Sequence, residues 1–237
     1  GRVTRTGCPV HVRPVRVASY NTRDFLDDRD AAASVVRAID PDVLCLQEVP
    51  RRLGAAWRVS RFAGACGMAW VGRHRGSGGT TIFVSERIRV SGAGHHRLPV
   101  RLLDRTRGYA VAHLVIDGWQ PLTAVSLHLS LRPEERQRHA GAILAALADQ
   151  PGALVVAGDL NELNDGAAHR AFAQGLRVVS GSVPTYPSRA PRKALDVIFA
   201  TPHLKVVAGP PVVLDDAVLA AASDHRPVWV DLTPGSV

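Results

Sequence analysis

The chain has 237 residues, a length at the upper end of one domain with a single core, and 46% of them are hydrophobic. Its three cysteines, Cys8, Cys45 and Cys66, are an odd number without paired metal-ligand spacing, which argues against a disulfide framework or a cysteine zinc site. The net charge of +8 favours anionic partners, although arginine with hardly any lysine is also what a GC-rich genome would encode.

A strand, a helix and a second strand open the predicted fold. Residues 16–20 and 43–46 are apolar runs of strand length, and apolar residues at near-helical spacing within 26–39 predict the helix between them. Later strands are predicted where apolar or alternating runs are separated by Gly, Pro and Asp, at 80–85, 109–116, 121–127, 154–157, 195–200 and 228–232.

Two further helices are predicted among these strands. Pro133 followed by Glu134 and Glu135 makes a good first turn, because proline's missing N–H is harmless there and acids suit the positive end of a helix. This helix should run to about residue 148, and a shorter one should cover 167–174. Many strands with interspersed helices predict layered sheets covered by helices, an α/β or α+β sandwich.

Polar side chains follow several of these apolar runs, at or just past the carboxyl end of the run: Asn21, Glu48, His128, Asp159 and Asp224. Polar groups displayed on strand ends converge at one rim of a sheet core. Taken singly, each has an ordinary explanation as a cap, a turn residue or a structural histidine. Glu48 closely follows four apolar residues, so its carboxylate should be partly desolvated and suited to a hard cation such as Mg²⁺ or Mn²⁺.

The segment Gly158-Asp159-Leu160-Asn161 ends an apolar strand. In an extended backbone, residues two apart point to the same face, so Asp159 and Asn161 can address one ligand together. Gly158 permits close approach of a substrate or metal. An ordinary turn explains the same four residues equally well.

The segment Ser-Asp-His-Arg-Pro, which contains Asp224 and His225, is the most specific single signal in the chain. Asp196 lies in an otherwise apolar strand, where an unpaired acid is costly, and His225 is its candidate partner. A carboxylate that accepts one ring N–H fixes the tautomer and raises the basicity of the other nitrogen. Asp224 is then free to bind a metal.

Together the clusters form an ordered set of a strand-end Asn, a Gln-Glu, a strand-end His, Gly-Asp-x-Asn, a strand Asp and Ser-Asp-His. This set resembles the endonuclease/exonuclease/phosphatase family, and it spans nearly the whole chain, from 17 to 232. The resemblance implies a four-layer α/β/β/α sandwich, in which two packed, mainly antiparallel sheets are flanked by helices. It also implies hydrolysis of phosphoesters with Mg²⁺ or Mn²⁺ as cofactor.

The resemblance also implies a role for each motif residue. Asn21 and Glu48 look like metal-site residues, Asp224 like a further metal ligand, and His128 like a group that stabilises the phosphate. Asp159 and Asn161 would position the nucleophilic water and the scissile phosphate. Asp196 would orient His225, which would also be catalytic. Whether Asp159 or His225 acts as general base stays open.

Two segments near these motifs have plainer interpretations. Arg107 resembles an arginine that some family members aim at substrate phosphate, but we expect it to be a solvated surface residue. The glycine-rich stretch 76–79 lacks the Lys-Ser/Thr of a nucleotide P-loop, so we expect a flexible loop at the rim.

The family resemblance covers nucleases, inositol-phosphate phosphatases and sphingomyelin-type phosphodiesterases, which differ in their loops. Positive charge favours nucleic acid, so we expect a phosphodiesterase or nuclease. A phosphatase or phosphodiesterase of a small or lipid phosphate is the alternative, and a catalytically inert binding module is a third. Aromatic residues make up only 5% of the chain, and we find neither a long aromatic hairpin for membrane insertion nor a string of aromatics for base stacking.

The expected location and domain division of the protein follow from its apolar stretches and from the two ends of the sequence. No apolar stretch is long enough to span a membrane, and no basic-then-apolar leader opens the chain. We expect a cytoplasmic monomer, and secretion stays open because a start at Gly1 permits a removed leader. We divide the chain into an N-terminal extension over 1–15 that need not be ordered, a catalytic domain over 16–233 and a tail over 234–237.

Overall fold

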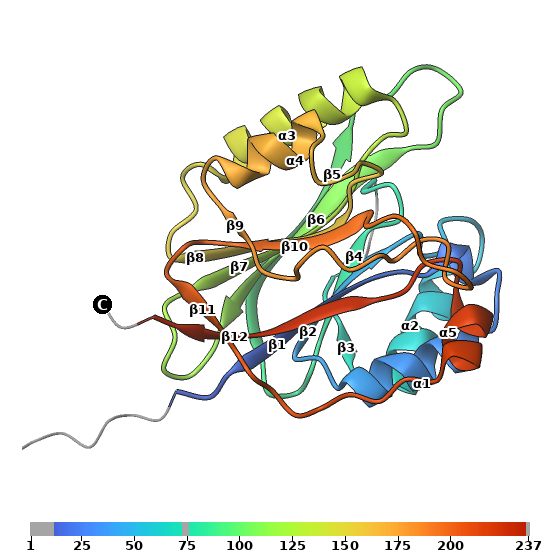
Figure 1. The fold of residues 1–237 in the computed structure, drawn as a ribbon, viewed down its shortest axis with the longest axis horizontal. Coiled ribbons are helices and arrows are strands. Elements are labelled where there is room, and N and C mark those ends of the chain that lie inside the picture. The colour runs from blue at the N-terminus through green and yellow to red at the C-terminus, as the bar shows by residue number, and fades with distance from the viewer. Residues whose placement is uncertain (1–11, 73–75, 236–237) are drawn as a thin grey trace, which may run out of the picture.

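Two six-stranded sheets packed face to face form the centre of the computed structural model, which describes residues 12–72 and 76–235 (Figure 1). The first sheet has the strand order β11 (Leu204–Val207), β12 (Val228–Pro234), β1 (Val15–Asn21), β2 (Val43–Gln47), β4 (Thr81–Val84) and β3 (Ala69–Trp70). The second has the order β5 (Arg89–Leu98), β6 (Arg107–Val115), β7 (Leu122–His128), β8 (Ala153–Asp159), β10 (Asp196–Ala200) and β9 (Arg177–Val178).

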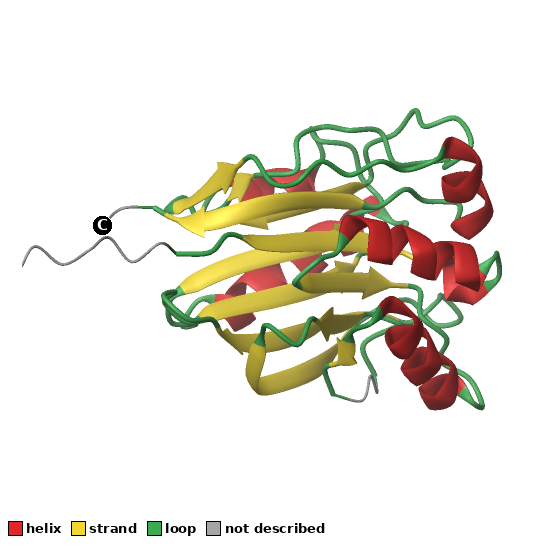
Figure 2. Cartoon of the chain, turned by 90° about the horizontal axis from the view of Figure 1, so that it is seen from below, coloured by secondary structure: helices red, strands yellow, loops and turns green. Residues whose placement is uncertain are grey.

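Helices cover the outer face of each sheet (Figures 1 and 2). Helices α1 (Arg29–Ile39), α2 (Ala55–Cys66) and α5 (Asp216–Ala222) pack on the first sheet, and α3 (Pro133–Leu147) and α4 (Ala167–Ala173) pack on the second. All strand pairings are antiparallel except β1 with β2 and β7 with β8. The predicted four-layer α/β/β/α sandwich with mainly antiparallel sheets is therefore confirmed.

Burial on both faces explains why the central strands are continuous apolar runs. In β1, Val15 and Val17 face the opposite sheet, while Ala18 and Tyr20 face the helices. Side chains alternate between the two faces of a strand, so a strand covered on both sides is apolar at most positions, and its buried polar residues need partners, as Arg16 of β1 has in Asp231. Cys45 of β2 is one of the buried residues between the sheets, and burial raises the pKa of its thiol to about 12.

The first helix begins later than predicted, at Arg29 rather than at residue 26. The Asp28 carboxylate accepts hydrogen bonds from the backbone N–H groups of Asp30 (3.0 Å) and Ala31 (2.9 Å), and this N-cap fixes the start. The preceding residues form a single 3₁₀ turn, η1 (Arg23–Phe25). Helices α2 and α5 and strands β3, β5, β9 and β11 were not predicted from the sequence. The four missed strands are the edge strands of the two sheets, and α5 is only seven residues long.

The predicted ends of the domain fall partly beyond the described structure. Residues 1–11 of the predicted extension, with Cys8 among them, and residues 236–237 of the predicted tail lie outside the described residues. Strand β1 already begins at Val15, and β12 ends at Pro234. Within residues 12–72 and 76–235, no helix is long and apolar enough to cross a bilayer.

Candidate active site

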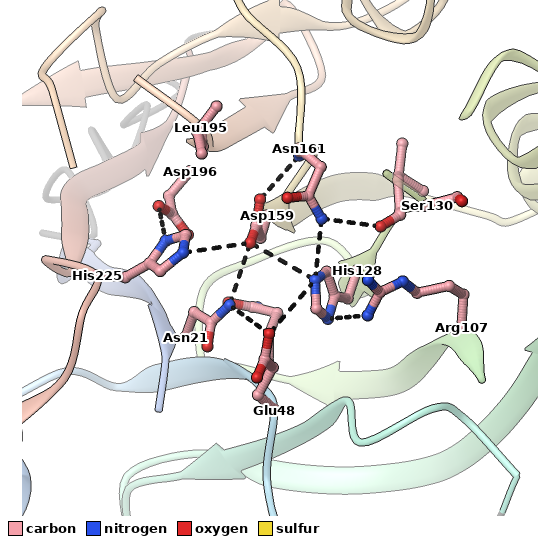
Figure 3. Close-up of polar contacts among 12 residues, drawn as sticks. Asn21, Glu48, Arg107, His128, Ser130, Asp159, Asn161, Leu195, Asp196 and His225 are labelled. Carbon is pink, nitrogen blue, oxygen red and sulfur yellow. Dashed lines mark hydrogen bonds and ion pairs between the residues drawn. The ribbon is translucent and has the colours of Figure 1, made fainter. Parts of the chain in front are cut away.

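One end of the sandwich collects the predicted site residues from six strands and their loops (Figure 3). The parallel pairs β1–β2 and β7–β8 bring their carboxyl ends to this end of the molecule. Strands β10 and β12 run antiparallel to β8 and β1, so they bring their amino ends to the same place. Asp224 therefore precedes the amino end of β12, and does not follow the carboxyl end of an apolar strand as the sequence suggested.

Asp196 and His225 form the predicted hydrogen-bonded pair. His225 Nδ1 lies 2.8 Å from Asp196 Oδ2, and both side chains are buried. The same carboxylate oxygen accepts a hydrogen bond of 2.6 Å from the hydroxyl of Thr185, which is also buried. Thr185 stands in the loop before β10 and has no sequence pattern that could have identified it. The pair fixes the ring so that Nε2 points towards Asp159, at 3.7 Å from Oδ2.

Charge within this cluster shifts the protonation of its members. Burial disfavours the charged form of His225, but Asp196 and Asp159 outweigh it and raise the pKa of His225 to about 10. Burial likewise raises the pKa of Asp159 to about 6, although the nearby His225 opposes the shift. Near neutral pH the site thus holds an imidazolium, while Asp159 is the group close to its titration point.

Asp159 and Asn161 meet at the end of β8, as the sequence predicted, but through a turn and not through extended backbone. Asn161 has a φ of 51°, in the left-handed region, and its backbone N–H donates to Asp159 Oδ1 over 2.8 Å. The other oxygen of Asp159 accepts a hydrogen bond of 3.1 Å from Asn21 Nδ2. Asn161 Nδ2 in turn donates to the backbone carbonyl of Leu129 over 3.0 Å.

His128 is held in its neutral form by its surroundings. Its Nδ1 lies 3.3 Å from Arg107 NH1, and its Nε2 lies 3.1 Å from Asn161 Nδ2, so both ring nitrogens face donors. Nδ1 can accept the Arg107 N–H only while it carries no proton, which leaves Nε2, also 3.6 Å from Asp159 Oδ2, as the one place for a ring N–H. Burial, together with the charge of Arg107, lowers the pKa of His128 well below its usual 6.5.

Arg107 is buried at the start of β6, so the expected solvated surface position is wrong. The glycine-rich stretch explains why, because Ser77, Gly78 and Gly79 are themselves buried and are not a flexible loop at the rim. Ser77 and Thr80 fix this turn, since the hydroxyl of each donates to the carbonyl of the other over 2.8 Å. A Cβ on Gly78, whose φ is +68°, would lie 2.7 Å from Cα of Arg107. The turn therefore packs directly against the Arg107 backbone.

We expect Gly78→Ala to destabilise the fold by roughly 1 to 3 kcal/mol more than Gly54→Ala, because its Cβ would collide with backbone. Gly54 is the matched control, since its φ of +75° is similar but nothing lies within 4 Å of its added Cβ. Urea unfolding of both variants measures the difference, and activity should fall in Gly78→Ala alone as Arg107 shifts. Equal destabilisation of the two variants would contradict the close packing.

Three oxygen-bearing side chains lie where the sequence predicted a metal site. Asn21 Nδ2 is 3.4 Å from Glu48 Oε1, while the second oxygen of Glu48 pairs with Arg105 NH1 at 3.2 Å. Asp224 pairs with Nε of Arg23 at 3.5 Å. Burial raises the pKa of Asp224, and the nearby Glu48 adds to the rise. A hard divalent cation fits this set, because its donors are oxygens and it would relieve the repulsion between the carboxylates.

A second group of potential ligands consists of Asp159, Asp196 and His225, whose ligand atoms lie within 4.8 Å of one another. His225 Nδ1 already binds Asp196, and the cationic ring compensates the two acids. Glu48 and Asp224, with Asn21, therefore stay the predicted metal ligands. Arg23 and Arg105, which pair with these carboxylates, were not identified from the sequence, where they look like ordinary surface arginines.

Comparisons with known proteins identify the family and the fold of the chain. The sequence model of the Endonuclease/Exonuclease/phosphatase family matches residues 18–225. No curated protein sequence matches the chain.

Several solved structures share the fold at low sequence identity. An Enterococcus faecalis V583 protein described as functionally unknown has a TM-score of 0.77 at 16% identity, over 92% of this chain and 99% of its own. An endonuclease/exonuclease/phosphatase from Bacteroides vulgatus has a TM-score of 0.75 at 19% identity, over 93% and 99%. A mannosyl-6-phosphatase from Bacteroides thetaiotaomicron has a TM-score of 0.71 at 18% identity, over 92% and 99%.

Proposed function

The chain belongs to the endonuclease/exonuclease/phosphatase family. We propose that it hydrolyses phosphoester bonds at the cluster around Asp159 and His225, with the help of a divalent metal. The observation that carries this proposal is the convergence of Asn21, Asp159 and Asn161 on His128 and the Asp196–His225 pair. An inert binding module would have no need for a buried, charge-shifted set of this kind, because such sets lower stability and typify catalytic sites.

Each step of the proposed hydrolysis has its own residues in the site. Asp159, with a pKa raised to about 6, accepts the proton of the attacking water, and the His225 imidazolium holds the carboxylate in place. Asn161 and neutral His128 contact the non-bridging phosphate oxygens. Glu48 and Asp224, with Asn21, would hold Mg²⁺ or Mn²⁺. When bound, this ion supplies the Lewis-acid stabilisation of phosphate charge that hydrolysis requires.

We expect chelation of divalent metal to lower the rate on the order of 10³-fold, with recovery on adding Mg²⁺ or Mn²⁺, because several kcal/mol of charge stabilisation are lost. Calorimetric titration with Mg²⁺ gives an independent measurement, and Glu48→Gln and Asp224→Asn should each weaken binding. Glu134→Gln is the control, since Glu134 pairs only with Arg101 on the surface. Undiminished hydrolysis after exhaustive chelation would refute the metal requirement.

Nucleic acid is the substrate class that the net charge of +8 favours. If it is the substrate, affinity for a short duplex should fall steeply with salt. The logarithm of the association constant should decrease against the logarithm of the salt concentration with a slope of about −0.9 for each phosphate neutralised. Fluorescence anisotropy across a range of salt concentrations measures this slope. A flat response would argue for the second candidate below.

A phosphate-bearing lipid is the second candidate, and the observation that favours it is a group of exposed leucines around the site. The deciding experiment is a panel of single- and double-stranded nucleic acids, phosphorylated inositols and sphingomyelin, each tested with Mg²⁺ and with chelator. A monomeric state and a cytoplasmic location remain predictions.

A further inference from the structure

Large apolar side chains stand exposed around the mouth of the candidate active site. Among the described residues, seven large hydrophobic side chains are at least 61% exposed. Leu26, Leu103 and Leu131 line two hollows beside the site, and Leu53, Trp57 and Leu102 directly adjoin residues that line them in the sequence. Val213 does neither. The other six we call the apolar rim: Leu26, Leu53, Trp57, Leu102, Leu103 and Leu131. Single exposed leucines are common on proteins, but six gathered at one site indicate a surface that another body covers.

Two hollows connect the apolar rim to the catalytic cluster. One, of about 520 Å³, is lined by Leu26 and Arg105, and the other, of about 500 Å³, is lined by Leu103, Leu131 and also Arg105. Arg105, which lines both hollows, pairs with Glu48 at 3.2 Å, so both hollows adjoin the partner of the predicted metal ligand. Arg107, which lines the second hollow, lies 3.3 Å from His128. Whatever covers the apolar rim therefore lies directly over the site.

The apolar rim is also basic, because each of three loops sets a leucine beside an arginine: Arg52 with Leu53, Arg101 with Leu102, and Leu131 with Arg132. Arg101 and Arg132 have acidic partners, Glu134 at 3.2 Å and Asp104 at 2.7 Å. Arg51 and Arg52, by contrast, have no acidic partner among residues 12–72 and 76–235, and both line the first hollow. The partner that covers the apolar rim should therefore offer an apolar interior for the leucines and negative charge for the arginines.

We propose that the apolar rim docks this protein on an anionic lipid surface. The leucines and Trp57 enter the interface, and Arg51 and Arg52 contact headgroup phosphates. Together with the proposed phosphoester hydrolysis, on which this assignment rests, docking gives the site a phosphoester carried by a membrane lipid as its substrate. The two hollows receive the headgroup while the catalytic cluster faces the bilayer.

Two other occupants fit these observations less well. Single-stranded nucleic acid binders present aromatic side chains for base stacking, whereas five of the six rim residues are leucines. A second copy of the chain, docked by a twofold axis, would set the same surface, with its unpaired Arg51 and Arg52, on both sides of the interface.

Sedimentation with vesicles of phosphatidylcholine, with or without phosphatidylglycerol, tests the proposal. The protein should bind the vesicles that contain phosphatidylglycerol, and Leu102→Ser/Leu103→Ser should weaken binding at least about tenfold, since two exposed leucines no longer leave water. Val213→Ser, at an 89% exposed valine outside the apolar rim, should bind like the parent.

A second pair of variants tests the charged component. Arg51→Ala/Arg52→Ala should reduce the preference for phosphatidylglycerol on the order of tenfold, because each arginine near an anionic surface contributes to binding. Arg89→Ala is the control, since Arg89 is an exposed arginine at the start of β5, paired with Asp117. Melting temperatures of all variants verify that each one folds.

Hydrolysis of a soluble phosphodiester, bis(p-nitrophenyl) phosphate, with Mg²⁺ separates this inference from the proposed function. Vesicle binding without hydrolysis of any phosphoester would leave docking intact and reject the proposed function. Hydrolysis of the soluble diester without binding to either vesicle would overturn docking alone. Docking would also be overturned if the leucine variant bound as well as the parent. Light scattering that showed a dimer dispersed by the leucine substitutions, with no vesicle binding, would instead make the apolar rim an interface between copies.

Discussion

Replacing Asp159 by asparagine is expected to lower kcat by roughly 10²- to 10⁴-fold, the usual contribution of one positioned acid–base group. Asp159 is the carboxylate at the centre of the cluster, and it lies 3.1 Å from Asn21 Nδ2 and 3.7 Å from His225 Nε2. An amide keeps the size of the side chain and one acceptor oxygen for the Asn161 N–H, but it cannot take a proton from water.

The same substitution should leave the melting temperature unchanged or raise it. Burial raises the pKa of Asp159 to about 6, so the folded protein holds the ionised form at a disadvantage near neutral pH. The free energy of folding gained by removing a disfavoured buried charge offsets the free energy lost with one hydrogen bond from Asn21. Steady-state rates with Mg²⁺ and thermal melts measure the two effects. Asp117→Asn, the same change at a fully exposed position, is the control.

A normal rate in Asp159→Asn, on a substrate that the parent cleaves with metal, would remove Asp159 from the mechanism. A collapsed fold would show instead that its hydrogen bonds to Asn21 and Asn161 are primarily structural.

Replacing His225 by alanine is expected to abolish turnover and, in contrast to Asp159→Asn, to destabilise the fold by about 3 kcal/mol. A position at the end of a strand would by itself predict little effect on stability. The structure, however, buries Asp196 and Asp159 beside this ring, and its removal leaves both acids without their cationic partner. Asp196→Asn added to His225→Ala should restore part of the stability and none of the activity.

The dependence of stability on pH provides a test that is specific to His225. Its pKa is raised from 6.5 to about 10 in the folded protein, so its contribution is fully present below pH 6.5 and is lost as pH rises towards 10. With chelator present, the melting temperature of the parent should fall across this window, and His225→Ala should lack that part of the decline. Parallel curves for the two proteins would contradict the cationic form of the ring.

The sequence by itself determined the sandwich and most of the catalytic cluster. Strand β2 is apolar over its first four positions, which is the pattern of a strand covered on both faces, and the polar residues that end such strands are local features of the chain. The pairing of Asp196 with His225 could be predicted because an isolated acid in an apolar strand is costly, and few partners were available. Such inferences need only the strand pattern and the chemistry of one side chain.

The tertiary structure alone decided which distant segments meet. Arg107 is buried because the turn at Gly78 packs on its backbone, and no property of residues 106–109 encodes that contact. Thr185 becomes a partner of Asp196 only because the loop before β10 folds back onto the pair. The apolar rim is likewise composed of separate loops, whose leucines look like ordinary loop residues in the sequence. Periodicity reports whether a residue faces a core, whereas the neighbour it meets there depends on the relative placement of elements far apart in the chain.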